Sequence, residues 1–214
     1  MVKQIKVRER ILDSNEKLAK KIKLKLKKNS MFAINVMASP GAGKTSLILE
    51  TIRRLKGSYQ IGVIDGDVVE VDVDQIKAEK VPVVLANTGG ACHLDAVMVD
   101  KAVDKLNLSK LDLLIVENVG NLICPMHFAI GTDKNIVIAS VPEGDDKPEK
   151  YPAMFFGADV IIINKMDYLS VAEFDMDRFT KAVRKLNAEV KIFPLSCKTK
   201  EGIGAWINWL KKQL

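Results

Sequence analysis

The chain has 214 residues, of which 48% are hydrophobic, and its 33 Lys and Arg against 27 Asp and Glu leave a formal charge of +6. This composition excludes a disordered chain, and no apolar run approaches the ~18 residues that a membrane span needs. Its three cysteines are too few for a disulfide framework, and the N-terminus has no apolar signal core. We therefore expect a soluble, cytoplasmic protein with no membrane partner.

The first 30 residues are strongly basic, with eleven Lys and Arg against three acidic residues. Leu18, Ile22 and Leu26 recur at i, i+4 and i+8, which predicts an amphipathic helix whose apolar side packs on the body. We accordingly divide the chain into a basic N-terminal helical extension, 1–30, and a main domain, 31–214. The alternative is an arm that contacts nucleic acid or anionic lipid, but the arm has no aromatic residues to stack on bases.

After the basic extension, short apolar runs alternate with amphipathic stretches. Seven runs rich in Val and Ile lack polar alternation, which is typical of strands buried on both faces. These runs are Phe32–Met37, Gln60–Asp65, Pro82–Ala86, Leu111–Glu117, Asn135–Val141, Asp159–Asn164 and Val190–Pro194. Helical periodicity lies between or after them at Lys44–Leu55, Leu94–Leu106, Met176–Leu186 and Gly204–Leu214. The alternation predicts an α/β domain with a doubly wound, mainly parallel seven-stranded sheet and helices on both faces.

A glycine-rich turn joins the first predicted strand to the first predicted helix. Residues 38–45 read ASPGAGKT, which matches the phosphate-loop pattern G-x-x-x-x-G-K-[ST] except for an alanine at the first glycine. Gly41 and Gly43 let backbone N–H groups turn toward a phosphate at the positive end of the helix. Lys44 would reach the β- and γ-phosphates, and Thr45 would bind Mg²⁺. The pattern predicts a P-loop NTPase, with nucleotide bound by Gly41, Ala42, Gly43, Lys44, Thr45 and Ser46.

A second nucleotide-recognition pattern follows the sixth strand. Residues 164–167 read NKMD, and the carboxylate of Asp167 can accept hydrogen bonds from two guanine N–H groups that adenine cannot offer in that arrangement. Residues 196–198 read SCK and resemble the SAK loop that closes over guanine in GTPases, with Cys197 in the alanine position. We therefore expect GTP and GDP as ligands, recognised by Asn164, Lys165, Asp167, Ser196, Cys197 and Lys198.

Acidic residues near the ends of two further strands are candidates for magnesium binding and catalysis, because the carboxyl ends of parallel strands border the ligand crevice. Asp67 is the first choice for binding Mg²⁺ or positioning the attacking water, Glu117 is the second, and Asp72 in a predicted switch loop is the third. Each could instead cap a helix or solvate a loop. We expect Lys44, Asp67 and Glu117 to be the catalytic residues. Because no Ras-like glutamine follows Gly120, we expect slow hydrolysis, on the order of 10⁻⁴ to 10⁻² s⁻¹.

Two cysteine-containing segments also follow strands. Cys92 and His93 come after the third strand and Cys124 after the fourth, so the three converge if those strands lie near each other. Thiolate and imidazole suit zinc, nickel or copper, and a second protomer could complete a four-ligand site. Alternatively, the cysteines are inert apolar residues and His93 caps the next helix. His127 has suitable chemistry but is not among the predicted ligands.

With these elements assembled, the chain resembles the HypB-type GTPases that deliver nickel during [NiFe]-hydrogenase maturation. The resemblance spans roughly 32–214. It rests on the segments SPGAGKT (39–45), NTG (87–89), CHLDA (92–96), ENVGNL (117–122), CP (124–125), EGDDKP (143–148), YP (151–152) and NKMD (164–167). The phosphate loop and NKMD occur in many GTPases, whereas CHLDA, ENVGNL and EGDDKP are far more particular to this family.

The resemblance implies a GTP-dependent homodimer whose nickel or zinc site uses Cys92, His93 and Cys124 near the dimer interface. It also implies a small zinc-containing partner of the HypA type and, downstream, the hydrogenase large-subunit precursor. Lys147 either reaches toward the other protomer or is an ordinary surface lysine. Residues 1–30 contain neither Cys nor His, so the chain departs from relatives with an N-terminal cysteine cluster or His-rich storage segments.

Three alternatives stay open at this point. A urease-type nickel GTPase carries a Cys-Pro-His metal element, whereas here the Cys-His pair and Cys124-Pro125 lie in separate segments. A metal-binding scaffold could use GTP only to set its oligomeric state. The weakest alternative, an RNA-associated GTPase that uses the basic arm, would bind RNA in a strongly salt-dependent way.

Overall fold

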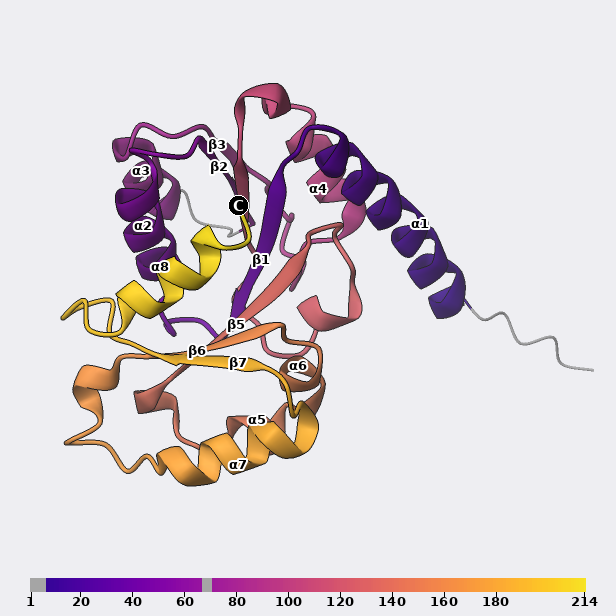
Figure 1. The fold of residues 1–214 in the computed structure, drawn as a ribbon. Coiled ribbons are helices and arrows are strands. Elements are labelled where there is room, and N and C mark those ends of the chain that lie inside the picture. The colour runs from indigo at the N-terminus through magenta and orange to yellow at the C-terminus, as the bar shows by residue number, and fades with distance from the viewer. Residues whose placement is uncertain (1–6, 67–70) are drawn as a thin grey trace, which may run out of the picture.

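The computed structural model describes the backbone of residues 7–66 and 71–214, and the side chains of 12–66 and 73–214. The described residues form a sheet of seven strands, all parallel, in the order β3-β2-β4-β1-β5-β6-β7 (Figure 1). The strands are β1 (Phe32–Ala38), β2 (Ile61–Asp65), β3 (Val83–Leu85), β4 (Leu113–Glu117), β5 (Lys134–Ser140), β6 (Val160–Asn164) and β7 (Lys191–Pro194). The predicted α/β fold is confirmed, and every predicted strand is present within one or two residues at each end.

Helices cover both faces of this sheet because successive strand residues point to opposite sides. Ile34 and Val36 of β1 pack in one core with the helices α2 (Lys44–Leu55) and α8 (Ile203–Lys211). Ala33 and Met37 face the other side, in cores that α4 and α7 complete. The helices on that side are α1 (Val7–Lys28), α4 (Ala96–Val103), α5 (Lys147–Lys150), α6 (Pro152–Phe156) and α7 (Met176–Leu186) (Figure 1).

The predicted helix bounds need three corrections. The helix expected over Leu94–Leu106 begins only at Ala96, because the Asp95 side chain accepts a hydrogen bond from Met98 N and thereby fixes the start of α4. The last helix ends at Lys211 and not at Leu214. A further helix, α3 (Val71–Ala78), was not predicted, because its sequence VDVDQIKA alternates like a strand and lacks a helical apolar face.

The structure also bears on two of the acidic candidates. Asp72 does not belong to a switch loop, because its backbone lies within α3. Asp67 lies outside the described residues. The structure therefore assigns neither carboxylate a place in the site.

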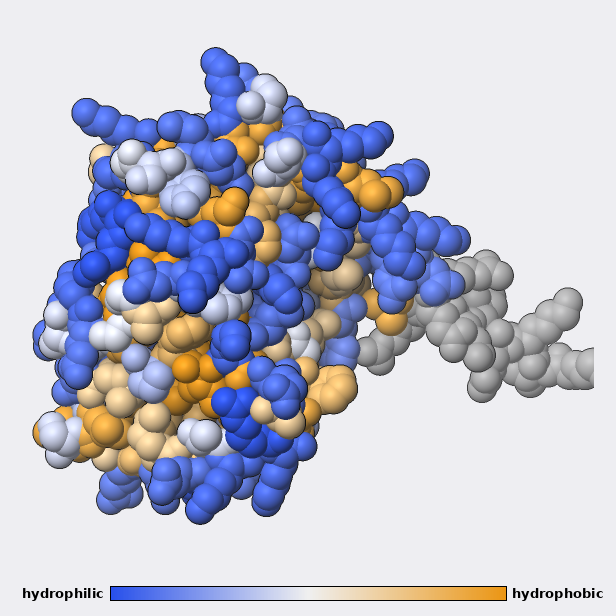
Figure 2. All heavy atoms as spheres, in the orientation of Figure 1, coloured by the Kyte–Doolittle hydropathy of each residue, from blue (hydrophilic) through white to orange (hydrophobic). Residues whose placement is uncertain are grey.

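The predicted amphipathic helix at the N-terminus is present as α1, which spans 22 residues. Ile22 and Leu26 are buried in a core that they share with residues of α4, and Leu18 packs at its edge. Hydrophilic side chains cover the outer side of α1 in Figure 2. Within the described part of the chain, none of the helices has the length and apolar character required to cross a bilayer.

Glu50 on α2 anchors the loop that follows β7. Its carboxylate accepts hydrogen bonds from Lys200 Nζ at 2.5 Å and from Arg53 Nη1 at 3.2 Å, and Lys200 Nζ also donates to the carbonyl of Cys197 at 2.7 Å. Burial by itself raises the pKa of Glu50, but the two cations outweigh it and hold that pKa below its usual value. The ionised Glu50 therefore ties the predicted guanine loop to the helix of the phosphate loop.

Glu50→Gln should lower the melting temperature in a pH-dependent way. Because the pKa is lowered in the folded state, the stabilisation is present above the unfolded pKa of about 4.3 and is lost as the pH falls through the folded value. Thermal unfolding at pH 7 and at pH 3 checks this. The difference in melting temperature between the variant and the native chain should be larger at pH 7. Glu189→Gln, at an exposed position, is the control. An equal difference in melting temperature at both pH values would contradict the interpretation.

Candidate nucleotide and metal sites

The phosphate loop lies between the end of β1 and the start of α2. Gly41 and Gly43 adopt left-handed φ values of 76° and 102°, so side chains there would be strained. At Gly43 an added Cβ would also lie 2.3 Å from Nδ2 of Asn164. A cavity of about 400 Å³ opens here, lined by Lys44 and Thr45 and by the loop after β4. The turn therefore presents backbone N–H groups and the buried Lys44 to a space suited to phosphates.

The NKMD segment is bonded directly to this loop. Asn164 Nδ2 donates to the carbonyl of Ala42 at 2.9 Å, and its Oδ1 accepts from Cys197 N at 3.2 Å. Lys165 Nζ donates to the carbonyl of Gly41 at 2.7 Å. One asparagine amide thus holds the phosphate loop and the SCK segment together, which brings the predicted phosphate-binding and base-binding residues into one site.

Asp167 lies at the base-binding end of the site. Its Oδ1 accepts a hydrogen bond from Ser196 Oγ at 2.6 Å, and Lys198 Nζ lies 3.9 Å from its other oxygen. Lys198 also lies over the ring of Tyr168, 5.8 Å from the centroid. Burial raises the pKa of Cys197 to about 11, so this thiol stays protonated and serves as a small packing residue of the loop.

Hard oxygen ligands gather at the phosphate end. Thr45 Oγ1 donates to Glu117 Oε1 at 2.9 Å, and Glu117 is fully buried at the end of β4. Asp65, also fully buried, is the register partner of Glu117 on β2. Hydroxyl and carboxylate oxygens beside a phosphate loop fit Mg²⁺. Asp65 was not among the residues predicted from the sequence, which selected Asp67 two positions later; the available signal was a carboxylate at the last position of a predicted strand.

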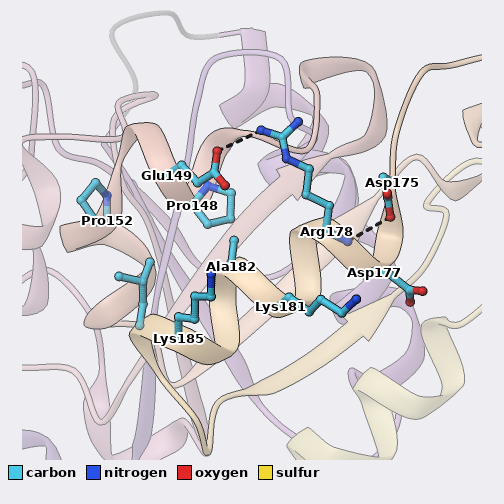
Figure 3. A pocket seen from close by; sticks show the side chains of 10 residues that line it. Pro148, Glu149, Pro152, Asp175, Asp177, Arg178, Lys181, Ala182 and Lys185 are labelled. Carbon is cyan, nitrogen blue, oxygen red and sulfur yellow. Dashed lines mark hydrogen bonds and ion pairs between the residues drawn. The ribbon is translucent and has the colours of Figure 1, made fainter.

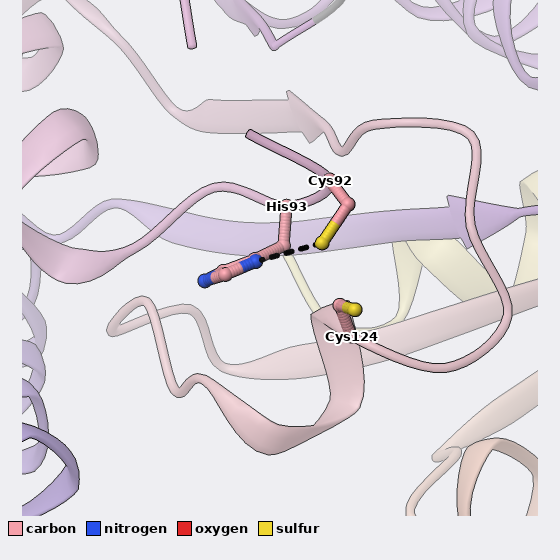
Figure 4. Close-up of side chains that lie close together, drawn as sticks. All are labelled: Cys92, His93 and Cys124. Atoms are coloured by element: carbon pink, nitrogen blue, oxygen red, sulfur yellow. Dashed lines mark hydrogen bonds between the residues drawn. The ribbon is translucent and has the colours of Figure 1, made fainter. Parts of the chain in front are cut away.

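The predicted soft-metal residues come together although β2 separates β3 from β4 in the sheet. The ligand atoms of Cys92, His93 and Cys124 all lie within 4.8 Å of one another, and Cys92 Sγ is 3.6 Å from His93 Nδ1 (Figure 4). Two ligands 2.3 Å from a tetrahedral ion would be about 3.8 Å apart. These three side chains can therefore bind one soft metal ion after small rotations and leave a fourth position open.

The surroundings of His93 favour its neutral form. The ring of His93 stacks on Phe128 with centroids 3.9 Å apart. Burial lowers the pKa of His93, which favours the neutral imidazole that binds metals. The pKa of Cys124 is raised, mainly by its hydrogen bond with Cys92 and secondly by burial. A metal ion that binds Cys124 would therefore have to displace the proton of this thiol.

One buried side chain next to Glu117 was not predicted as a site residue. The Oδ1 atom of Asn118 accepts hydrogen bonds from the backbone N–H of Leu94 and of Val119, each at 3.0 Å. Its Nδ2 donates to Asn35 Oδ1 at 3.1 Å. Leu94 directly follows His93, so Asn118 fixes the backbone of the metal-binding segment from the end of β4. A lone asparagine in the sequence carries no signal for such a long-range contact.

The EGDDKP segment supports the phosphate loop from its other side. The hydroxyl of Ser39 donates to the carboxylate of Glu143, which also accepts from Ser140 N at 2.9 Å. Lys147 Nζ donates to the carbonyl of Glu143 and lies 3.5 Å from Asp146. Glu143 therefore links the phosphate loop to the helix that begins at Lys147.

A larger hollow, of about 660 Å³, lies between α5, α6 and α7 (Figure 3). Arg178 spans its rim and forms ion pairs with Glu149 at 2.9 Å and with Asp145 at 3.2 Å. Its lining contains none of the residues predicted to bind nucleotide or metal. The candidate site is therefore the smaller cavity at the phosphate loop together with the adjacent cysteine cluster.

The chain is similar in sequence and fold to known proteins. The family model described as "CobW/HypB/UreG, nucleotide-binding domain" matches residues 32–194. The hydrogenase maturation factor HypB of Escherichia coli K12 is 40% identical over 204 residues, which cover 95% of this chain and 70% of that protein. HypB from Helicobacter pylori, solved in complex with nickel, superposes with a TM-score of 0.89 at 38% identity, covering 94% of both chains. HypB from Archaeoglobus fulgidus superposes with a TM-score of 0.88 at 37% identity, covering 94% of this chain and 98% of that one.

Asp167→Asn should reverse the base preference. Because an amide donates where the carboxylate accepted, it mismatches the guanine amine and matches the carbonyl that xanthine carries at that position. An unpaired buried group costs about one to three kcal/mol, so we expect GDP to bind about 10- to 100-fold more weakly and XDP to bind more tightly. Calorimetric titration with GDP and XDP measures both, with the exposed Asp177→Asn on α7 as control. Unchanged GDP affinity would exclude Asp167 from base recognition.

Proposed function

Since this chain belongs to the HypB family of hydrogenase maturation factors, we propose that it is a GTP-hydrolysing metallochaperone that carries nickel for [NiFe]-hydrogenase assembly. The observation that carries the proposal is that two consecutive residues connect the phosphate loop with a cluster of soft metal ligands. Glu117 faces Thr45, and the next residue, Asn118, holds the segment of Cys92 and His93. This arrangement supports a protein whose nucleotide state alters its metal site.

In the nucleotide half, Lys44 and the backbone N–H groups of the glycine turn bind the phosphates, and Asp167 with Ser196 recognises guanine. Thr45 and Glu117 would hold Mg²⁺, which supplies charge neutralisation on the β- and γ-phosphates. We retain Asp67 as a proposed second magnesium or water-positioning carboxylate. Because no Ras-like glutamine directly follows Gly120 in the sequence, we propose a slow intrinsic GTPase.

In the metal half, Cys92, His93 and Cys124 bind the transported ion. Two thiolates and an imidazole suit nickel and zinc alike, so the donor set does not choose between them. The nickel complex of the Helicobacter pylori relative supports nickel as the cargo. Cys92 is exposed and Cys124 is half-buried, so the ion can be passed to another protein without unfolding the domain.

Assembly follows from the open fourth position of the cluster. We propose that two protomers pair in the GTP-bound state and share the metal site, because a symmetric copy can supply the missing ligand. The exposed side chain of Ile123, beside Cys124, would be covered in such a pair. Nickel would arrive from or leave to a zinc-containing partner of the HypA type and finally reach the hydrogenase large-subunit precursor.

The nucleotide controls the metal through the end of β4. GTP and Mg²⁺ would engage Thr45 and Glu117, and any shift of that backbone would move Asn118 and the Leu94 N–H that it holds. A tenfold difference in metal affinity between the GTP and GDP states corresponds to about 1.4 kcal/mol of coupling. After hydrolysis the site relaxes and releases its nickel.

Nickel bound per protomer should depend on both the nucleotide and Cys92. Equilibrium dialysis of the full chain with a non-hydrolysable GTP analogue and with GDP measures this, and Cys92→Ala should remove most binding in either state. Nickel uptake that is indifferent to Cys92 would place the metal elsewhere. Identical affinity in both nucleotide states would contradict the switch, and GTP binding without turnover would favour a scaffold.

Asn118→Ala should remove the nucleotide dependence. The variant loses the bond to Leu94 N, so nickel affinities with the GTP analogue and with GDP should agree within about twofold, against about tenfold in the native chain. Asn35→Ala is the matched control, because it breaks the same amide network but leaves the bond to Leu94 in place. Both variants leave a buried polar group unpaired and should lose about 1–3 kcal/mol of stability. Coupling that survives in Asn118→Ala would exclude this route.

A further inference from the structure

One buried asparagine joins the N-terminal helix to both segments of the metal cluster. Asn15 lies on α1 and is only 7% exposed. Its Oδ1 accepts a hydrogen bond from Ala96 N at 2.8 Å, and its Nδ2 donates to the carbonyl of Ala129 at 2.8 Å. The two backbone groups are 33 residues apart in the chain.

Both bonds lie near the histidine, one through the chain and the other through a ring contact. Ala96 is the first residue of α4 and follows His93 by three positions. Ala129 directly follows Phe128, whose ring stacks on His93. Asn15 therefore connects the segment that carries Cys92 and His93 with the segment that follows Cys124.

The helix that carries Asn15 is itself firmly placed. Ala19, Ile22 and Leu26 are buried in the core that includes Leu94. At Gly131 (φ 87°), an added Cβ would lie 2.7 Å from the carbonyl of Ala19 and the Cβ of Ile22, so the loop after Ala129 passes tightly under α1. Asn15 can consequently act as a fixed support for both segments.

The chemistry of the position requires a primary amide. Ala96 N is one of the unpaired N–H groups at the start of α4 and needs an acceptor, whereas the carbonyl of Ala129 needs a donor. An asparagine amide supplies one of each on neighbouring atoms. Alanine supplies neither, and aspartate supplies the acceptor but turns a second oxygen toward the Ala129 carbonyl.

We propose that Asn15 is a positioning residue of the metal site, which makes the N-terminal helix part of the framework that sets the geometry of Cys92, His93 and Cys124. Asn15 binds no metal. It fixes the distance between the two ligand segments and the place of Phe128 against His93. This inference rests on the proposed binding of nickel by the cluster.

The test compares Asn15→Ala with Asn29→Ala in the full chain. Asn29 lies just beyond the end of α1, and its side chain donates to the carbonyl of Lys25 four residues earlier, so the loss of this side chain affects the helix without affecting the cluster. Nickel affinity is measured by competition with a chelator, together with the thiolate-to-nickel charge-transfer absorption. We expect about tenfold weaker binding and an altered absorption band for Asn15→Ala, because orienting contacts around metal ligands typically contribute 10- to 100-fold. Asn29→Ala should match the native chain in both.

Three outcomes separate the explanations. Native affinity and absorption in Asn15→Ala, or equal changes in Asn29→Ala, would overturn the role of Asn15. Failure of the native chain to bind nickel through Cys92 would instead overturn the proposed function. Should Asn15→Ala unfold, Asn15→Asp retains the bond to Ala96 N and loses the donor, and a native absorption band in that variant would also overturn the proposal.

Discussion

Two consecutive side chains, that of the last residue of β4 and that of the residue after it, point to opposite faces of the sheet, and both candidate sites are bonded to them. Glu117 turns toward α2 and bonds Thr45, while Asn118 turns toward the other face and bonds the N–H of Leu94. Because the two residues are neighbours on one backbone, a shift of that backbone would move both contacts together. The central strand therefore holds the phosphate end of the nucleotide site and the metal segment in a fixed relation.

Hydrogen bonds of asparagine side chains connect several other segments of the two candidate sites. Asn164 links the phosphate loop to the SCK segment, Asn118 links β4 to the segment of the metal cluster, and Asn15 links that segment to the one after Cys124. An amide side chain is suited to this role because it offers a donor and an acceptor at once and carries no charge that burial would penalise.

The site combines rigid support with accessible ligands. Asn15, Asn118 and Leu94 are buried, whereas Cys92 is exposed and Cys124 is half-buried. Such a gradient suits a protein that has to release an ion to a partner, because the geometry is set from inside and the exchange occurs at the surface. The basic outer side of α1 is available for solvent, while its inner side supports the cluster.

The sequence by itself determined the seven strands, the phosphate-loop pattern, the NKMD segment and the three candidate soft ligands. Their signals are local: apolar runs, glycines at tight turns, and reactive residue types directly after strands. It did not determine α3, whose apolar residues alternate, nor the buried Asp65 beside Glu117. The roles of Asn118 and Asn15 were equally invisible, since an asparagine reads as a turn or surface residue until its partner is known. Only the tertiary structure decides such contacts, because Asn15 bonds Ala129, 114 residues away, and both groups need the packed core to meet.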